Sequence, residues 1–302
     1  MTEQDQHDLN QDYDKKITNK YKSKIINDIL EIGDYGKEAL DITNLMFLEK
    51  FNILTLKIYI TTRMILKMKN TAIRKLTLVK PWTIIEQQLN LNIDDLELEN
   101  LEVLLLGDIQ LKNDQLYNLS KFKKLKILDV SRNYVDLIHI HNVQSLTKLD
   151  MQYCCLINIE LIYVLVNLQD LNLNSNPKID IIPVYKVKGL IKLSISECQL
   201  KQIDQIAQLT NLEVLTISYN QLKNIDPISQ LINLKELSIR QNYDIDITPL
   251  NSLVGLIKLD ILDCKLVSIC ALRPLVNLQF LVISFNQIVY LHNNFWQIEQ
   301  VE

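Results

Sequence analysis

Leucine and isoleucine recur along most of this chain at fixed intervals, separated by polar residues. Nine segments share the pattern L-x-x-L-x-L-x-x-N/C-x-L or a close variant of it. They begin at Leu101, Leu125, Leu146, Leu168, Leu190, Leu212, Leu234, Leu256 and Leu278. From Leu146 onward, consecutive starts are 22 residues apart. Self-similarity at this period is typical of repeat architectures, so we expect nine copies of one structural unit.

Within each unit, the x-L-x-L-x part alternates between apolar and variable positions. A period of two predicts a short strand with one buried face, for example over residues 214–217. One unit cannot bury its own leucines, so neighbouring units must supply the core. The stack therefore predicts one long parallel sheet.

The ninth position of each unit is the second regular feature. It holds an amide or a thiol in eight units, namely Asn133, Cys154, Asn176, Cys198, Asn220, Asn242, Cys264 and Asn286. The chain turns inward here, and its backbone N–H and C=O groups need partners away from water. An amide donates and accepts hydrogen bonds, and a thiol does so weakly. We therefore interpret this column as a structural ladder.

The second half of each unit carries an apolar residue at about every third position, as at Leu222, Ile225, Ile228 and Leu231. This spacing favours tight three-residue turns over a long helix. Three prolines, at 183, 227 and 249, occupy the same place in three units, where the interior of a regular helix would exclude them. We expect short 3₁₀ or irregular turns on this side.

These motifs resemble the leucine-rich repeat, in the 22-residue class found in the type 1 phosphatase regulatory subunit and in bacterial internalins. The Ile-, Asn- and Lys-rich composition is also similar to large sets of repeat proteins in flagellated protists. The resemblance implies an α/β repeat solenoid, a curved arc with a concave parallel sheet and short convex turns. The crossover rule predicts that it is right-handed.

The N-terminal third departs from the regular repeat. Residues 1–12 are polar, and Ile17, Tyr21 and Ile25 at spacings of four indicate an amphipathic helix over 13–29 that caps the open core. Residues 30–100 are interpreted as degenerate repeats that lose the ladder residue, with Thr61 and Pro81 in its place; a small helical cap is the alternative. The nine regular repeats and a short tail occupy 101–302.

Composition narrows the function class. Leu and Ile make up 94 of 302 residues, whereas Gly is only 5, which disfavours disorder and glycine-rich phosphate loops. The formal net charge of -4 gives no basic field for nucleic acid. No apolar stretch is long enough to span a membrane or to act as a signal peptide. The 5 Cys lack paired spacing, so we expect a cytoplasmic protein.

Candidate chemistry is sparse. Two histidines, His139 and His141, form an H-x-H segment without a further ligand at metal spacing. A metal or redox set of Cys154, Cys198 and Cys264 is the alternative to the ladder, but these residues lie two or three coils apart. Neither a catalytic motif nor a phosphate loop occurs. We expect no enzyme activity, no metal and no cofactor.

The variable positions beside the strand leucines are the candidate partner-binding surface. Tyr and Arg are common interface anchors, and exposed apolar clusters are unusual. The candidates are Asp129, Arg132, Asp150, Tyr153, Asn172, Tyr219, Arg240, Asp260, Phe280 and Phe285, with Val282 beside the two phenylalanines.

The sequence thus predicts a non-catalytic interaction module or scaffold that binds an unidentified protein on its concave face. Regulation of a protein phosphatase and surface adhesion are the two alternatives that the repeat class suggests. End-to-end association with a second copy is a further prediction. Nucleic acid and membranes are not expected as partners.

Overall fold

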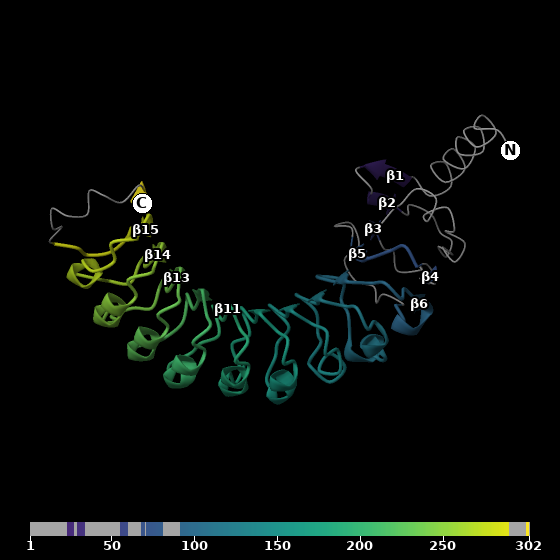
Figure 1. Ribbon diagram of the computed structural model, residues 1–302, viewed down its shortest axis with the longest axis horizontal. Helices are drawn as coiled ribbons and strands as arrows, with labels where there is room; N and C mark the ends of the chain where they lie inside the picture. The colour runs from purple at the N-terminus through teal and green to yellow at the C-terminus, as the bar shows by residue number, and fades with distance from the viewer. Residues whose placement is uncertain are drawn as a thin grey trace. The chain divides into compact units, whose positions relative to one another are not determined.

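The computed structural model describes residues 23–26, 29–33, 55–59, 68–69, 71–80, 91–289 and 300–301. The chain divides into two compact units, residues 1–135 and residues 136–302, which we call the N-terminal and the C-terminal unit (Figure 1). Each is treated separately below.

The C-terminal unit is a stack of short parallel strands. They are β9 (Lys148–Asp150), β10 (Asp170–Asn172), β11 (Lys192–Ser194), β12 (Val214–Thr216), β13 (Glu236–Ser238), β14 (Lys258–Asp260), β15 (Phe280–Val282) and β16 (Gln300–Val301). From β9 to β15 each strand pairs in register with the next, at a sequence offset of 22 residues. The sequence pattern predicted these strands, and the structure confirms them.

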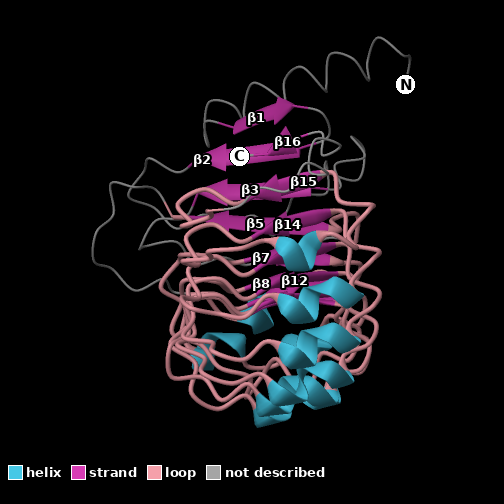
Figure 2. Cartoon of the chain, turned by 90° about the vertical axis from the view of Figure 1, so that its left-hand side faces the viewer, coloured by secondary structure: helices cyan, strands magenta, loops and turns pink. Residues whose placement is uncertain are grey.

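The side opposite the sheet is formed by 3₁₀ helices. They are η4 (Glu160–Val164), η5 (Ile182–Lys186), η6 (Asp204–Gln208), η7 (Asp226–Gln230), η8 (Thr248–Ser252) and η9 (Cys270–Leu272). Strands line the inner side of this unit and the 3₁₀ helices its outer side (Figures 1 and 2). Pro183, Pro227 and Pro249 stand in the first turn of their helices, where a missing N–H is not needed. The predicted short turns are confirmed.

The core lies between these two layers. In the coil that starts at Leu212, the strand side chains Leu215 and Ile217 and the outer residues Ile228 and Leu231 are fully buried. Equivalent residues of the neighbouring coils lie above and below them. The core is therefore continuous along the stack, as expected for a repeat that cannot bury its apolar face alone.

The N-terminal unit contains a second run of strands, whose order is β1 (Ser23–Ile26), β2 (Ile29–Gly33), β3 (Thr55–Tyr59), β5 (Lys75–Val79), β7 (Val103–Leu105) and β8 (Ile127–Asp129). The pair β1–β2 is antiparallel, and the later pairs in this run are parallel. A short parallel pair joins β4 (Met68–Lys69) to β6 (Leu96–Glu97). The 3₁₀ helices here are η1 (Ile93–Asp95), η2 (Asn113–Leu116) and η3 (Leu119–Lys121).

One N-terminal expectation needs correction. The helix predicted over 13–29 does not form at Ser23–Ile26, where the backbone pairs with β2 as strand β1. Ile25 and Ile26 are β-branched and favour extended backbone, which competes with the helical spacing of the apolar residues. Residues 1–22, as well as Thr61 and Pro81, lie outside the described residues. In the part of the chain that the structure describes, no helix is long and apolar enough to cross a membrane.

Candidate functional site

The asparagines of the ladder join each coil to the one before it. In the C-terminal unit, Asn220 Oδ1 accepts the backbone N–H groups of Cys198 (3.1 Å) and Leu200 (3.0 Å). Its Nδ2 donates to the carbonyls of Ile195 (3.0 Å) in the preceding coil and Ile217 (2.9 Å) in its own. Asn133, Asn176 and Asn286 repeat this arrangement. The amide thus satisfies buried backbone groups of two coils at once.

The ladder cysteines make fewer bonds. Cys198 Sγ donates to the carbonyls of Leu173 (3.3 Å) and Ser196 (3.4 Å), and Cys264 Sγ donates to that of Ile239 (3.3 Å). Burial raises the pKa of the Cys198 thiol and raises that of Cys264 to about 11. These thiols are therefore neutral at physiological pH and contribute packing and weak donation. Cys155 and Cys270, which lie outside the ladder, are exposed.

The other candidate ligands are not gathered into a metal site. Over the described residues, no group of three His, Cys, Asp or Glu side chains is arranged to hold a metal ion. His141 Nδ1 lies 2.9 Å from the backbone carbonyl oxygen of Leu137, which anchors its ring to its own turn.

The residue just before the ladder has an unusual backbone. In every coil of the C-terminal unit from β9 to β15 it lies in the left-handed region, with φ between 49° and 60°. The residues are Tyr153, Ser175, Glu197, Tyr219, Gln241, Asp263 and Phe285. This region favours glycine, yet none of these positions holds one. The sequence pattern did not predict this conformation, because the pattern records hydrophobic positions and a left-handed φ does not depend on hydrophobicity.

A second left-handed residue follows the ladder position in some coils. It occurs at Gln110, Cys155, Gln199 and Lys265, directly after Ile109, Cys154, Cys198 and Cys264. In each of these coils an asparagine Oδ1 of the next coil accepts both the ladder N–H and the N–H two residues later. The left-handed residue between them turns both N–H groups toward one oxygen.

Four of the predicted partner-binding residues have a structural task. The carboxylate or amide oxygen of each accepts the backbone N–H two residues later in its own coil, at 2.9 to 3.3 Å. The residues are Asp129, Asp150, Asn172 and Asp260. Such Asx-type bonds shape the turn that leads to the ladder. These side chains therefore define the backbone of the strand face, and their outward surface is only partly exposed.

In the coils between Asn172 and Asp260, the equivalent backbone N–H donates to a side chain of the preceding coil. Asn174 Oδ1 accepts the N–H of Ser196 (2.7 Å), and Ser196 Oγ accepts that of Ser218 (2.9 Å). Ser218 Oγ in turn lies 3.1 Å from the N–H of Arg240. A row of small polar side chains thus links four coils and replaces the Asx-type bond in the last three of them. Sequence reasoning had assigned these positions to the variable surface.

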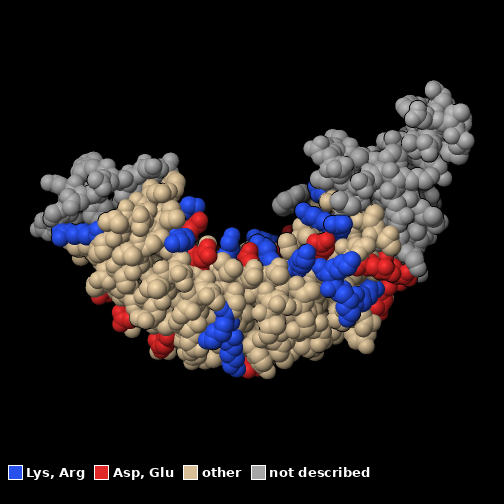
Figure 3. Space-filling model, viewed as in Figure 1, with Lys and Arg blue, Asp and Glu red and all other residues tan. Residues whose placement is uncertain are grey.

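Charged residues on the strand face are mostly paired. Lys148 Nζ lies 2.7 Å from Asp170, and Lys258 Nζ lies 3.1 Å from Glu236. Arg240 Nε donates to the Asp260 carboxylate. Both signs of charge occur on this side of the C-terminal unit (Figure 3). No single-sign field is present that would attract a polyanion to the described part of this face.

Three of the four aromatic candidates are exposed. Tyr153, Tyr219 and Phe285 are 41%, 44% and 80% exposed. Phe280 and Val282 are half-buried, and Lys258 Nζ lies 5.7 Å from the centre of the Phe280 ring. Arg132, in the N-terminal unit, is exposed and left-handed like the tyrosines. The candidates thus fall into two groups, exposed aromatic side chains and carboxylates that bond the backbone.

A further asparagine column, missed from the sequence, runs along the side of the stack. Each of its members directly precedes the first leucine of a unit, and its Nδ2 donates to a carbonyl 23 to 29 residues earlier, at 2.6 to 2.9 Å. They are Asn100, Asn167, Asn211, Asn233 and Asn277. The recurrent Asn-Leu pair at the start of these units was a visible signal. Gly189 and Gly255 interrupt the column.

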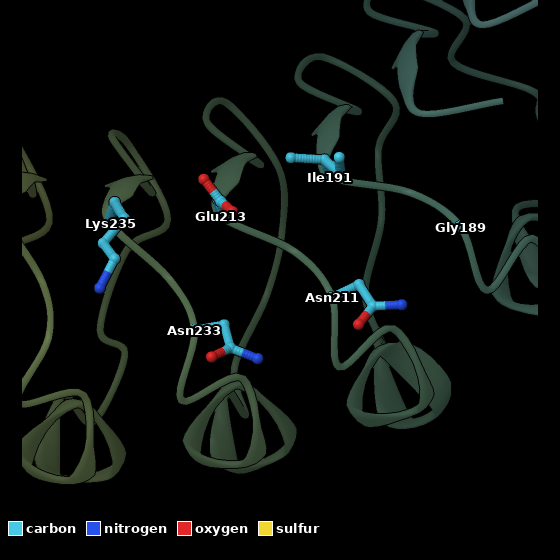
Figure 4. A pocket seen from close by; sticks show the side chains of 6 residues that line it. All are labelled: Gly189, Ile191, Asn211, Glu213, Asn233 and Lys235. Carbon is cyan, nitrogen blue, oxygen red and sulfur yellow. The ribbon is translucent and has the colours of Figure 1, made fainter.

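A shallow pocket of about 390 Å³ lies beside Gly189. It is lined by Gly189, Ile191, Asn211, Glu213, Asn233 and Lys235 from three consecutive coils (Figure 4). The lining combines amide and carboxylate oxygens with one ammonium group, and the pocket is open to solvent. We assign no ligand to it.

Comparison with known proteins supports the repeat assignment. The family model described as "Leucine Rich repeats (2 copies)" matches residues 188–230 and 210–252. A search of curated protein sequences gave no match.

Solved structures show the same fold. An internalin (inlF) from Listeria monocytogenes aligns with a TM-score of 0.68 and 23% identity, covering 91% of this chain and 86% of that one. The functional domain of InlJ from Listeria monocytogenes, which "includes a cysteine ladder", aligns with a TM-score of 0.53 and 20% identity. That alignment covers 74% of this chain and 51% of the InlJ chain. The family model thus identifies residues 188–252 as leucine-rich repeats, and the in-register coils on either side of them continue the same fold, which the internalin structures share.

Proposed function

We propose that the C-terminal unit binds a protein partner on its strand face, with Tyr153 and Tyr219 as the aromatic anchors. Leucine-rich repeat folds generally serve as non-catalytic interaction modules, which is the class supported by the comparisons. The strand face, the two anchors and the cytoplasm as the location are our proposal. The coils are ordered by their own core and ladder, so binding requires little ordering of the backbone.

The observation that carries the proposal is the left-handed column. Glycine would relieve backbone strain at each of these positions, yet the chain keeps two exposed tyrosines there. Tyr219 is 44% exposed, and it does not belong to the buried apolar core. The left-handed backbone presents these two large rings at the edge of the strand face, where a partner can contact them.

Arg240 and Phe285 extend this surface toward β15. The ion pair with Asp260 holds the Arg240 guanidinium in place on the face, which lowers the entropic cost of using it in a contact. Phe285 adds a large exposed ring in the same backbone column as the two tyrosines. Asp150, Asn172 and Asp260 contribute indirectly, because they shape the turns that present these side chains.

The test is the variant Tyr219→Gly. Because glycine fits φ of 55°, we expect the unfolding free energy to stay within about 1 kcal/mol of the wild type, whereas partner capture falls at least about tenfold. Capture is measured by affinity purification with mass spectrometry, followed by titration of the recovered protein. Ser175→Gly, at the same backbone position two coils away, is the matched control and should bind normally.

The same experiment decides between the functional alternatives. Recovery of a phosphatase catalytic subunit by the wild type, and its loss with Tyr219→Gly, would select phosphatase regulation. Labelling of the protein on intact cells would select adhesion. Undiminished capture by Tyr219→Gly and by Tyr153→Gly would exclude the tyrosines as anchors.

A further inference from the structure

The left-handed column of the C-terminal unit repeats every three coils. Its aromatic residues are Tyr153, Tyr219 and Phe285, at intervals of 66 residues, which is three coils of 22. The coil before Tyr219 holds Glu197 at this position, and the coil before Phe285 holds Asp263. A carboxylate followed by an aromatic ring in the next coil thus occurs twice. None of the column's positions holds a lysine or an arginine, so its charged side chains are all acidic.

Backbone hydrogen bonds fix the spacing of this column. The N–H of each column residue from Tyr153 (3.0 Å) to Asp263 (3.0 Å) donates to a carbonyl of the next coil. Hydrogen-bonded strands lie about 4.8 Å apart, so neighbours in the column are about 5 Å apart and the three-coil repeat is about 14 Å long. These N–H groups are already used within the stack, so the column recognises a partner through side chains.

The two carboxylates of the repeat are each held by a hydroxyl from the preceding coil. Glu197 Oε2 accepts the hydroxyl of Ser175 (3.0 Å), and Asp263 Oδ2 accepts that of Tyr243 (3.4 Å). Among the described residues, neither carboxylate forms an ion pair. The ammonium of Lys265 lies over the Tyr243 ring instead, 4.8 Å from its centre. A fixed carboxylate one coil from an exposed ring favours a cationic side chain, which gains an ion pair and a cation–π contact together.

We propose that the partner presents an extended segment with two basic side chains four residues apart. One contacts Glu197 and Tyr219, and the other contacts Asp263 and Phe285. This inference rests on the proposed function, because it specifies the partner of the same face. In an extended chain, residues i and i+4 point to one side and are about 13 Å apart, close to the repeat of the column. In an α-helix, residues about nine apart span this length but lie on opposite faces. The charge and the spacing therefore both favour an extended basic segment.

The first experiment selects binding peptides with the full chain, so that the natural partner need not be known. A random library of linear peptides displayed on phage is the probe, and the immobilised protein is the target. Selected sequences should be enriched in pairs of lysine or arginine four residues apart. The same selection on the double variant Glu197→Gln, Asp263→Asn should lose this spacing. Enriched sequences without the basic pair, or with the same pair in both selections, would overturn the proposal.

The selected peptide then allows each carboxylate to be tested alone by fluorescence anisotropy. Glu197→Gln and Asp263→Asn remove the charge, while the amide oxygen still accepts the hydroxyl of Ser175 or Tyr243. Each should weaken peptide binding by about fivefold at low salt and less at high salt, with an unchanged melting temperature. Glu213→Gln is the matched control, because it removes an exposed carboxylate of the same unit outside the column. An equal loss in the control would indicate a general charge effect and contradict the pairing.

A charge swap tests whether each basic side chain has its own carboxylate. Asp263→Arg should lose the selected peptide and regain binding to a peptide in which one of the two basic residues is replaced by glutamate. Replacement of the other basic residue should not restore binding, and the difference gives the direction of the segment along the stack. Recovery with both glutamate peptides, or with neither, would contradict the one-to-one pairing.

The tyrosine variants separate this inference from the proposed function. If peptide binding falls with Tyr219→Gly but does not depend on Glu197 or Asp263, the tyrosine anchor stands and the basic segment is excluded. If binding is unchanged in both Tyr153→Gly and Tyr219→Gly, the proposed function itself fails, whatever the sequence of the peptide.

Discussion

The ladder contains two kinds of coil, and their difference shows what a stacked turn requires. An asparagine coil both accepts N–H groups from the coil before it and donates to that coil's carbonyls, whereas a cysteine coil only donates. Within residues 136–302 each ladder cysteine is followed by an asparagine, and no two cysteine coils are neighbours. A thiol is tolerated where the next coil supplies the missing acceptor.

The backbone follows the same distinction. Coils with Cys154, Cys198 or Cys264 place a left-handed residue after the ladder, and both of their N–H groups reach one asparagine oxygen. The coil of Asn242, which precedes Cys264, lacks such an acceptor, and the N–H of Asp244 donates instead to the backbone carbonyl of Cys264 (3.2 Å). The left-handed turn thus accompanies a ladder cysteine, and the ladder asparagine of the next coil accepts the two N–H groups that this turn presents.

The largest expected effect comes from placing a thiol between two thiol coils. Asn176→Cys removes the acceptor for the N–H groups of Cys154 and Leu156, and two buried donors are left unpaired. We expect a loss of about 2–4 kcal/mol in the free energy of unfolding, measured by urea denaturation. Cys198→Ala is the comparison variant and should lose about 1–2 kcal/mol, because only packing and a weak donor are removed. Equal losses would show that the accepting oxygen is unimportant.

The second effect is a pH dependence contributed by the buried thiol of a cysteine coil. The pKa of Cys264 is raised by burial from 9.0 to about 11, so the unfolded chain loses this proton first as the pH rises. The stabilisation is complete below pH 9 and is lost as the pH rises through 11, by about 3 kcal/mol at most. Denaturation at a series of pH values should show this decline in the wild type and a smaller one in Cys264→Ala. Parallel curves for the two proteins would refute it.

The smallest effect compares two glutamines at the same position in the two kinds of coil. Gln199 follows Cys198 and has φ of 56°, whereas Gln221 follows Asn220 and is not left-handed. Gln199→Gly should be neutral or stabilising by up to about 1 kcal/mol, because glycine adopts this conformation without strain. Gln221→Gly should destabilise by about 0.5–1 kcal/mol through the entropy of the unfolded chain. A change of the same sign in the free energy of unfolding for both variants would contradict the assignment of different turns to cysteine and asparagine coils.

The sequence predicted the strands, the ladder positions and the 3₁₀ turns. Burial requires an apolar residue such as Leu215 in the strand and a hydrogen-bonding one such as Asn220 in the ladder, and steric rules place Pro227 in the first turn of a short helix. It did not predict the left-handed column or the Asx-type bonds of Asp150 and Asp260. The left-handed column depends on backbone dihedral angles, which the sequence does not show. A polar residue on a strand face also looks the same in sequence whether its side chain faces a partner or bonds the N–H two residues later. Exposed tyrosines were identified as candidates, but the reason for their exposure emerged only from the backbone.

The direction of the ladder bonds bears on how such an array lengthens. Each asparagine completes the turn of the coil before it, so a duplicated 22-residue segment that ends its strand with Asn brings along the bonds its predecessor needs. A duplicated cysteine segment brings no acceptor and is viable only ahead of an asparagine segment. Duplication of these segments is thus constrained by the type of the neighbouring segment. The order of asparagine and cysteine coils matters as well as their number.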